Sequence, residues 1–401
     1  MKTRGDKETP TRDGPLAGLR VTEVAHHLAG PLAGVLLADL GAAVVKVEPP
    51  GGDPWRRLGE VPGHPDLSPY FLALNGGKRS IVLDLAAPWG RAPFRRLLAA
   101  SDVVVTNLAQ DARERLGLSE RAIRRANPRV ILAAVEGAPP GNLDLTVQAL
   151  AGMIRTDEAG RPRPHAVPLN DTLAAALVAL VAVAALLERE RSSRGQSVAV
   201  SLLGAAATHL RPALLRTAPE RPVRTTFASA FHAVYETADG HLALAAYMQH
   251  LWRAAAAAAG DSALAADSRL DDPAAVVEAH EELGQRLAAA LRQKTTETCL
   301  ERFAAYGVPA AAVGGDWGAL LDAPAAQVEG LVETVSDPRL GRIEVSGPPF
   351  RLSRTPSPRP RPAPSLGADT VAVLMELGYS SRHARRLAHR PLTHSQAGTS
   401  L

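Results

Sequence analysis

The chain has 401 residues, of which 46% are apolar and 21% charged, so it is long enough for two domains and is not disordered throughout. Its formal charge of +4 comes from 45 basic and 41 acidic residues, and only 4% of the chain is Phe, Trp or Tyr. A nucleic-acid partner needs a basic face interleaved with stacking aromatic side chains, so this composition argues against one.

Between Leu19 and Leu203, short β-branched runs alternate with helical runs. This alternation is typical of a parallel sheet with crossover helices, and it predicts a Rossmann-like large domain over residues 15–210. The expected strands are Leu19–Val24, Ala43–Glu48, Ser80–Asp84, Asp102–Thr106, Val130–Val135 and Ser197–Ser201. The expected helices are Pro31–Leu40, Pro88–Ala100, Ser119–Ala126 and Thr172–Arg191.

The region after the first strand lacks a dinucleotide-binding fingerprint. The sequence His26–Gly34 stands where G-x-G-x-x-G would be required, and this disfavours NAD chemistry. Gly30 and Pro31 still predict a helix that begins at the ligand-binding edge of the sheet. His26 or His27, at the end of the strand, is therefore a candidate to face a site.

A linker rich in Pro and Arg, residues 211–228, is expected to end the large domain. Alternating residues in Phe231–Tyr235 and His241–Ala246, followed by Ala-rich helices to about Tyr306, predict a smaller α/β domain over residues 229–330. The chain is thus expected to hold two domains of different size.

The C-terminal part is expected to return to the large domain over residues 331–380. Val332–Val345 predicts a hairpin with its turn at Asp337–Gly341, whereas the prolines of Thr355–Pro364 exclude regular structure there. Asp369–Leu377 predicts a short helix, and residues 381–401 are expected to form a basic tail.

The cysteine content and the N-terminal residues bear on the compartment, which is expected to be the cytoplasm. Cys299 is the single cysteine and has no partner for an internal disulfide, which fits a reducing environment. Residues 1–14 are polar, are expected to be disordered, and lack the apolar core of a signal peptide. The apolar stretch Leu173–Leu187 is shorter than the roughly 20 residues of a bilayer span, so we expect a core helix and no membrane partner.

Asp171 is the most informative single residue, because it stands directly ahead of an apolar helix with no charge before Glu188. The helix dipole stabilises an ionised carboxylate there, and free backbone N–H groups can meet its oxygens. Two interpretations follow. Asp171 is either a helix cap, a role that Asn170 or Thr172 could share, or a nucleophile that needs no activating base.

A series of short runs, in unbroken order from about Pro15 to Ser380, resembles the class III CoA-transferases. This superfamily contains formyl-CoA transferase, carnitine CoA-transferase and α-methylacyl-CoA racemase. The matching runs are Pro15–Val21, Ala29–Pro31, Leu37–Ala42, Val45–Pro54, Leu74–Ser80, Gln148–Ala149, Gly195–Gln196, Gly347–Pro349 and Pro364–Gly367.

The resemblance implies a CoA-transferase in which Asp171 attacks an acyl-CoA thioester to form an anhydride and then an aspartyl-CoA thioester. It also implies that Lys78, Asn107 and Arg115 line the CoA site, with Lys46 and Arg79 as further candidates. Cations and helix ends are what the phosphates of CoA require. CoA and acyl-CoA are then substrates, and no permanently bound cofactor is expected.

The racemase branch of the superfamily uses a His beside an Asp to move the α-proton of an acyl-CoA. By resemblance, Leu143 stands at the His position and is followed by Asp144. Leucine carries no proton, so racemisation by this pair is disfavoured. Leu28, Leu143 and Asp144 are expected to line the substrate pocket, although Asp144 could equally cap a helix.

Two segments depart from the family pattern. Glu136–Gly141 is shorter than the family's glycine-bearing loop, and no Gly-rich lid is evident in Pro222–Tyr235. Both segments bear on how an anhydride is protected from water. No metal site is expected, because the histidines lack companion ligands at usable spacing.

The function expected from these observations is CoA transfer from an acyl-CoA donor to a carboxylic acid acceptor. The family's form is a homodimer of two interlocked rings. The alternatives are an acyl-CoA racemase or isomerase that uses Asp171 in proton transfer, and a CoA-binding homologue without turnover. The sequence does not name the donor or acceptor, because small pocket changes worth only about 1–3 kcal/mol decide acyl specificity.

Overall fold

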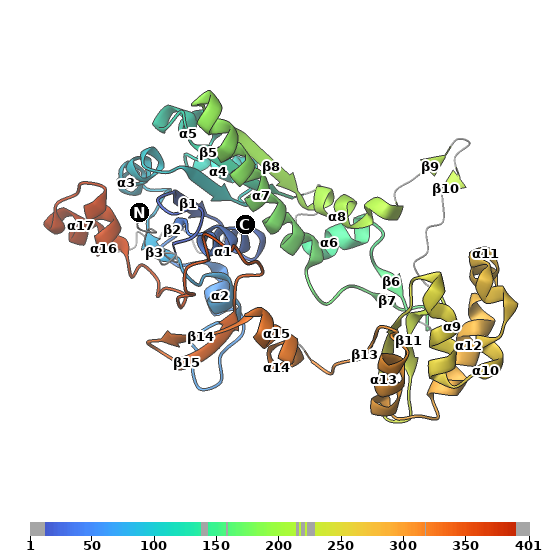
Figure 1. The fold of residues 1–401 in the computed structure, drawn as a ribbon. Helices are drawn as coiled ribbons and strands as arrows, with labels where there is room; N and C mark the ends of the chain where they lie inside the picture. Colours follow the sequence, from blue (N-terminus) through green and yellow to red (C-terminus); the bar gives the residue numbers. More distant parts are fainter. Residues whose placement is uncertain are drawn as a thin grey trace, which may run out of the picture. The chain divides into compact units, whose positions relative to one another are not determined.

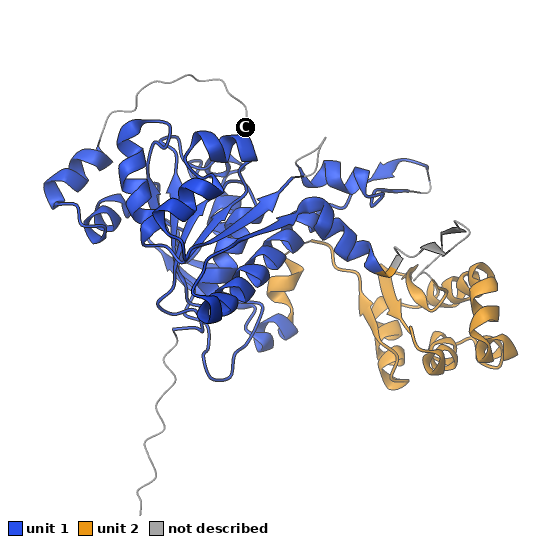
Figure 2. Cartoon of the chain, turned by 90° about the horizontal axis from the view of Figure 1, so that it is seen from above, with its two compact units in different colours: residues 1–211, 324–401 blue, residues 212–323 orange. Residues whose placement is uncertain are grey.

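The structure, a computed structural model, describes residues 13–137, 143–157, 159–213, 216–217, 221–222, 229–316 and 318–389 (Figure 1). The expected disordered N-terminus, most of the shortened loop, most of the linker and the end of the basic tail lie outside these residues. The chain divides into two compact units, Met1–Arg211 with Pro324–Leu401 and Pro212–Ala323 (Figure 2).

A six-stranded sheet of parallel strands forms the centre of the first unit, in the order β3-β2-β1-β4-β5-β8. All six expected strands are confirmed. Because the strand order reverses between β1 and β4, the carboxyl ends of these two strands flank the position where such sheets bind ligands. The strands are β1 Arg20–Val24, β2 Ala43–Glu48, β3 Arg79–Val82, β4 Val103–Thr106, β5 Ile131–Glu136 and β8 Ser197–Ser201.

Helices cover both faces of this sheet. The side chains of β4 show this, because they alternate between two cores. Val103 and Val105 belong to a core with α1 (Ala29–Asp39), α7 (Leu169–Ser192) and α8 (Leu202–Leu210). Val104 belongs to a second core with α3 (Pro88–Ala99), α4 (Gln110–Arg115) and α5 (Glu120–Ala126). Successive strand side chains point to opposite faces, so an almost continuous apolar strand supplies both cores.

Helix α7 supplies the core on one side and is exposed on another. Its inward alanines and Val178 are buried, but Leu180 and Leu187 are 62% and 61% exposed, and only 44% of its most apolar window is buried. By length and composition α7 could cross a membrane. A single helix of this kind is weak evidence for a membrane protein, because the core helix of a soluble protein passes the same test. Its apolar surface continues all round, whereas the sheet and α1 cover only one side.

Several short elements of the first unit were not expected, because runs of two to seven residues carry little periodic signal. They are the 3₁₀ turn Pro54–Arg57, α2 Pro69–Leu74, α4, and the hairpin of β6 Arg155–Thr156 and β7 Pro162–Arg163. Helix α6 Asp144–Leu150, which is important for the site below, was expected only as a helical run that Asp144 could cap.

The second unit has a three-stranded antiparallel sheet, β11-β12-β13, packed against helices. The buried Cys299 lies in this core. A separate two-stranded ladder of β9 Arg216–Thr217 and β10 Arg221–Pro222 precedes it. The other elements are β11 His232–Glu236, β12 His241–Ala245, α9 Gln249–Ala259, α10 Ser262–Ala265, the 3₁₀ turn Ser268–Asp271, α11 Pro273–Glu278, α12 His280–Leu291, α13 Thr296–Ala305, β13 Ala310–Ala312 and α14 Ala319–Asp322.

The C-terminal part returns to the first unit and covers the edge strand β3. The N–H of Asp369 donates to the carbonyl oxygen of Ser80, the N–H of Ser80 donates to Asp369 Oδ2, and the N–H of Val82 donates to Thr370 Oγ1. The expected hairpin and short helix are confirmed, and the basic tail contains a further helix whose Leu387 packs on the helix before it. The elements are α15 Pro324–Glu329, β14 Val332–Asp337, β15 Gly341–Ser346, α16 Thr370–Glu376 and α17 Ser381–Ala388.

Candidate functional site

Asp171 lies in the first turn of α7, and the structure separates the two interpretations of its position. The residue before the helix, Pro168, offers no side-chain cap. The cap comes from Asp144 instead, whose Oδ1 accepts the N–H of Asn170 at 2.7 Å and that of Asp171 at 3.1 Å. A carboxylate that accepts free N–H groups at a helix start is a strong cap. Asp144 therefore caps α7, and the side chain of Asp171 is left for another role.

Asp144 is itself held in place by a buried glutamine. Asp144 is the first residue of α6, and its carboxylate accepts a hydrogen bond from Gln148 Nε2 one turn later. Gln148 Oε1 accepts the N–H of His165 at 2.9 Å, on the segment that leads into α7. The sequence singled out Gln148 only as part of a family run. Its two contacts fix the start of α7 against α6.

The carboxyl group of Asp171 is half-buried, and its environment disfavours the charged form. Burial, and to a smaller extent the nearby carboxylate of Asp144, together raise the pKa of Asp171 to about 7. A group with such a pKa changes its charge close to neutral pH. Strongly perturbed carboxyl groups of this kind are frequent at functional sites.

The junction between β1 and α1 brings together three of the residues expected from the sequence. The amide of Asn107 accepts the N–H of His26 at 3.0 Å and donates to the carbonyl oxygen of His26 at 2.7 Å. Leu28 follows immediately, is buried, and stands at the start of α1, which packs against α7. Gly30 permits the close approach, since a Cβ there would lie 3.3 Å from the Asn107 side chain.

Lys78, the third of these residues, is buried under the same junction. Its ammonium donates to the carbonyl oxygens of Pro31 and Leu74 at 2.7 and 2.8 Å and to Asn75 Oδ1 at 2.9 Å. It also lies 2.8 Å from Glu23, and burial lowers the pKa of Lys78 to about 8. These contacts occupy the donors of the ammonium, so they assign Lys78 a structural role. A contact with CoA stays a prediction.

Glu23 belongs to a buried network of charges that the sequence analysis missed. Lys46 is fully buried and lies 2.8 Å from Glu23 and 2.9 Å from Asp53. Buried charges persist in proteins only when they are paired. The signal was present in the sequence, because Glu23 and Lys46 each stand between β-branched residues in a strand of the parallel sheet.

The remaining predicted residues lie elsewhere. Arg115 ends α4, is exposed, and pairs with Asp111 at 2.7 Å one turn earlier. Leu143 precedes α6 and is 66% exposed beside the buried Asp144. His26 is buried, whereas His27 is exposed, has a φ of 64° and contacts the edge of Trp55. Among the described residues, no hydrogen bond or ion pair joins Arg115 to Lys78 or Asn107.

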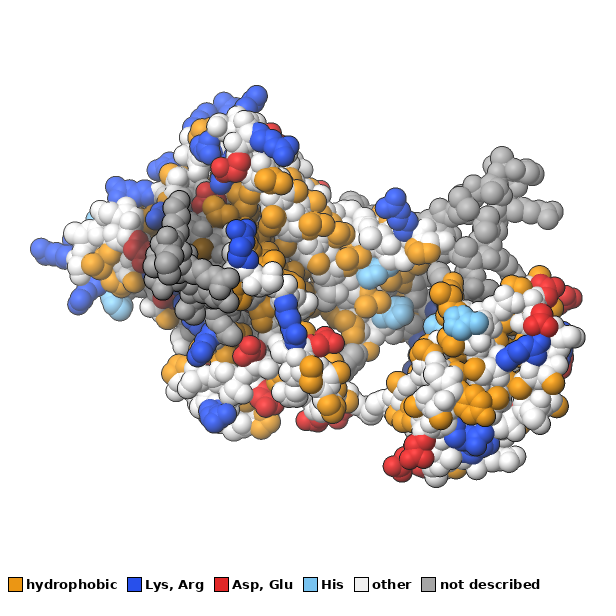
Figure 3. Space-filling view, viewed as in Figure 1, with side chains coloured by type: hydrophobic (Ala, Val, Ile, Leu, Met, Phe, Trp, Pro, Cys, Tyr) orange, Lys and Arg blue, Asp and Glu red, His pale blue; other side chains and the backbone are white. Residues whose placement is uncertain are grey.

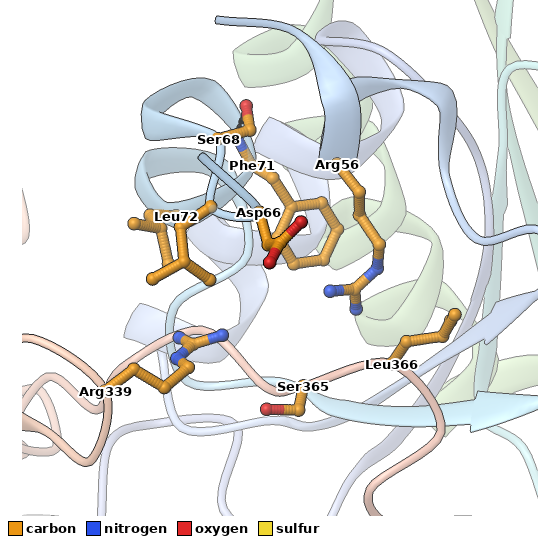
Figure 4. Close-up of a pocket in the computed structure, with 9 residues that line it drawn as sticks. Arg56, Asp66, Ser68, Phe71, Leu72, Arg339, Ser365 and Leu366 are labelled. Carbon is orange, nitrogen blue, oxygen red and sulfur yellow. Dashed lines mark hydrogen bonds between the residues drawn. The ribbon is translucent and has the colours of Figure 1, made fainter. Parts of the chain in front are cut away.

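Two cavities lie away from Asp171. The first, of about 240 Å³, has the guanidinium groups of Arg56 and Arg339 directed into it from opposite walls (Figure 4). Each guanidinium already holds a carboxylate, Glu48 for Arg56 and Asp337 for Arg339. The second, of about 430 Å³, lies between α4, α5 and β8. Within the described ranges, no three His, Cys, Asp or Glu side chains are grouped to hold a metal ion.

The family model described as CoA-transferase family III matches residues 16–370 of the chain. The chain is 32% identical to the succinate–glutarate CoA-transferase of Agrobacterium fabrum, over 94% of this chain and 99% of that protein. It is also 32% identical to a probable fatty acyl-CoA transferase of Mycobacterium tuberculosis, over 77% of this chain and 85% of that protein.

A solved structure shares the fold. The crystal structure of a CaiB/BaiF family protein from Brucella suis superimposes with a TM-score of 0.77 at 28% sequence identity, and the match covers 91% of this chain and all of that chain. The match therefore spans both units of the chain.

Proposed function

The chain belongs to CoA-transferase family III, and we propose that it moves CoA from an acyl-CoA donor to a carboxylic acid acceptor with Asp171 as nucleophile. The observation that carries this proposal is the half-buried Asp171 in the first turn of α7, whose capping duty is taken by Asp144. A carboxylate relieved of capping is available for attack. The named relatives act on different acids, so the proposal names no particular substrate.

The chemistry is a series of acyl exchanges at one carboxylate. Asp171 attacks the thioester carbonyl, expels CoA thiolate and forms a mixed anhydride. The thiolate then attacks the Asp171 carbonyl of that anhydride, which releases the donor acid and leaves an aspartyl-CoA thioester. The acceptor carboxylate attacks this thioester, and the returning thiolate takes the acceptor acyl group. Asp171 ends as a carboxylate, and each step conserves the reactive acyl bond.

The proposed roles of the neighbouring residues follow from their positions. Asp144 orients Asp171 through the backbone, and by the family resemblance Leu28 and Leu143 line the pocket for the acyl group. Asn107 and Arg115 are proposed to contact CoA, since a guanidinium binds phosphate well. Lys78 is proposed to support the CoA site from beneath, because its donors are taken by the chain itself.

The second candidate is proton transfer at the α-carbon of an acyl-CoA, and a third is CoA binding without turnover. The pKa of Asp171, raised to about 7, suits a general base, and this observation supports the second candidate. Leu143 argues against it, because a leucine has no proton to deliver to the opposite face.

A panel of acyl-CoA thioesters and free acids separates these functions. The proposal predicts that labelled CoA appears on a new acid, with no solvent deuterium entering the α-carbon. Deuterium entry without CoA exchange would establish proton transfer instead. Binding without either reaction across the panel would establish a non-catalytic homologue.

We also propose that the chain forms a homodimer, as the family resemblance implies, and that α7 contributes to the contact. Figure 3 shows apolar side chains gathered where α7 runs in Figure 1. Leu177, Leu180, Ala184 and Leu187 follow heptad spacing on the side of α7 that the sheet does not cover. Exposed apolar surface of this extent marks interaction sites.

An antiparallel arrangement of two α7 helices suits this stripe. A two-fold axis would place Leu177 opposite the partner's Leu187, and Leu180 opposite the partner's Ala184, so large residues meet small ones at the centre. A parallel arrangement would place Arg191 against its own copy at the end of the stripe, where like charges repel.

The test combines the mass of the protein in solution with its thermal midpoint. Interlocked rings cannot separate without unfolding, so Leu180→Arg is expected to stay a dimer and to lower the thermal midpoint, because it places a charge in the apolar contact. Leu320→Arg is the matched control and should leave the midpoint nearly unchanged, since Leu320 on α14 is also 62% exposed. Light scattering after gel filtration measures the mass, and thermal unfolding measures the midpoint. A monomeric wild type contradicts the dimer, and a Leu180→Arg variant as stable as wild type contradicts the assignment of α7.

A further inference from the structure

Asn170 carries a buried side chain without partners, directly beside Asp171. It is the second residue of α7 and is 0% exposed. Within the part of the chain that the structure describes, neither its Oδ1 nor its Nδ2 makes a hydrogen bond. A buried carboxamide without partners is destabilising, and native proteins contain few of them. Such a group next to a reactive carboxylate requires an explanation.

The backbone of Asn170 is fixed, so the residue cannot shift to relieve its side chain. Its N–H donates to Asp144 Oδ1 at 2.7 Å, the shorter of the two hydrogen bonds that cap α7. Asp144 is in turn held by Gln148. The cap therefore maintains the unpaired amide in place at the start of the helix.

The other neutral side chains around the start of α7 have their donors engaged. Gln148 Nε2 donates to Asp144 and to the carbonyl oxygen of His165. The hydroxyl of Thr172 donates to the carbonyl oxygens of Leu169 at 2.9 Å and Pro168 at 3.2 Å. Of these side-chain donors, only the two N–H groups of Asn170 have no acceptor among the described residues.

The proposed acyl exchanges need such a donor. Each attack on an acyl group carried by Asp171 converts a carbonyl oxygen into an oxyanion, and Asp144 cannot stabilise it because both groups are negative. We infer that Asn170 is a further catalytic residue, whose Nδ2 donates a hydrogen bond to the oxygen that becomes negative at the Asp171 acyl group. No proton is transferred in this contact. The inference rests on the proposed function and adds a residue to it.

Asn170→Leu tests the inference, since leucine has nearly the same size and no donor. We expect kcat to fall about 100-fold, the usual cost of one lost oxyanion donor, while KM changes by less than about threefold. The thermal midpoint should stay equal or rise, because an unpaired buried amide has been removed. Asn170→Ser, which restores a donor, should recover part of kcat.

Thr172→Val is the matched control, because the hydroxyl of Thr172 is already bonded to the backbone; its kcat should stay within about threefold of wild type. Full kcat in Asn170→Leu overturns the inference. The inference is also overturned if Asn170→Leu and Asn170→Ser both lose stability and kcat together. Asp171→Asn, assayed beside these variants, separates this outcome from failure of the proposed function. If Asp171→Asn is inactive and Asn170→Leu is fully active, only the role of Asn170 is wrong.

Discussion

The first unit contains two groups of buried or half-buried carboxylates, and they are neutralised differently. Glu23 and Asp53 each lie within 2.9 Å of a lysine ammonium. Asp144 and Asp171 lie together at the start of α7, where backbone N–H groups of the helix donate to Asp144 and the pKa of Asp171 is raised to about 7. A carboxylate paired with a cation holds the fold together, whereas one placed beside another carboxylate keeps its reactivity.

The largest effect expected from this difference is on catalysis at Asp171. Asp171→Asn should lower CoA transfer by at least about 1000-fold, because the amide cannot act as the nucleophile. Asp39→Asn is a close control, since burial also raises the pKa of Asp39, to about 6, on a different helix. Initial rates of transfer measure both variants. Equal losses in the two variants would contradict a specific role for Asp171.

The next effect concerns the stability of the lysine network. Lys46→Met leaves Asp53 without its cation and Glu23 with Lys78 alone, and it should lower the free energy of unfolding by about 3–5 kcal/mol. Arg115→Met removes an exposed pair with Asp111 and should leave the free energy of unfolding nearly unchanged, because solvent screens the pair. Denaturation by urea compares them. A Lys46→Met variant as stable as wild type would remove the distinction between the two groups of carboxylates.

A smaller effect is the pH dependence of stability due to Asp171. Its folded pKa of about 7 lies above the ordinary 3.8, so its contribution to stability is fully present below pH 3.8 and is lost as the pH rises through 7. Between pH 4 and pH 8, the free energy of unfolding of Asp171→Asn should therefore rise by about 1–3 kcal/mol relative to that of wild type. A constant difference across this range would show that Asp171 is not shifted.

The smallest effect is expected at Asp144. Asp144→Asn keeps a cap with a neutral oxygen, which should cost about 0.5–1 kcal/mol of stability. It also removes the negative charge that raises the pKa of Asp171, so the pH–rate profile should move toward lower pH. Thermal unfolding and pH–rate measurements follow both changes. A profile displaced to higher pH would contradict the electrostatic account.

The sequence predicted the parts of the fold that carry a long periodic signal. The six strands of the sheet and the helix after Asp171 follow from alternating apolar runs, and the hairpin after Val332 follows from its turn residues. Helix α6 has only seven residues, so the sequence indicated it only as a helical run that Asp144 could cap. The apolar composition of α7 indicated a core helix, but composition does not say how much of a helix its neighbours cover.

The candidate site was less predictable than the fold, because its roles depend on pairing across distant segments. Asp171 was identified from its place before a helix, but the residue that caps this helix is Asp144, 27 positions earlier. Lys78 matched a family run, and only the structure shows its ammonium bound to three acceptors of the chain. No sequence pattern indicated that the amide of Asn170 would be buried without partners.

Mass spectrometry of the peptide that contains Asp171 tests the central claim most directly. After incubation with an acyl-CoA, hydroxylamine should trap Asp171 as a hydroxamate, and borohydride should reduce an aspartyl-CoA thioester to an alcohol. Both products should be absent without acyl-CoA and in the Asp171→Asn variant. Deuterium uptake at the substrate α-carbon with an unmodified Asp171 peptide would contradict the account and establish proton transfer.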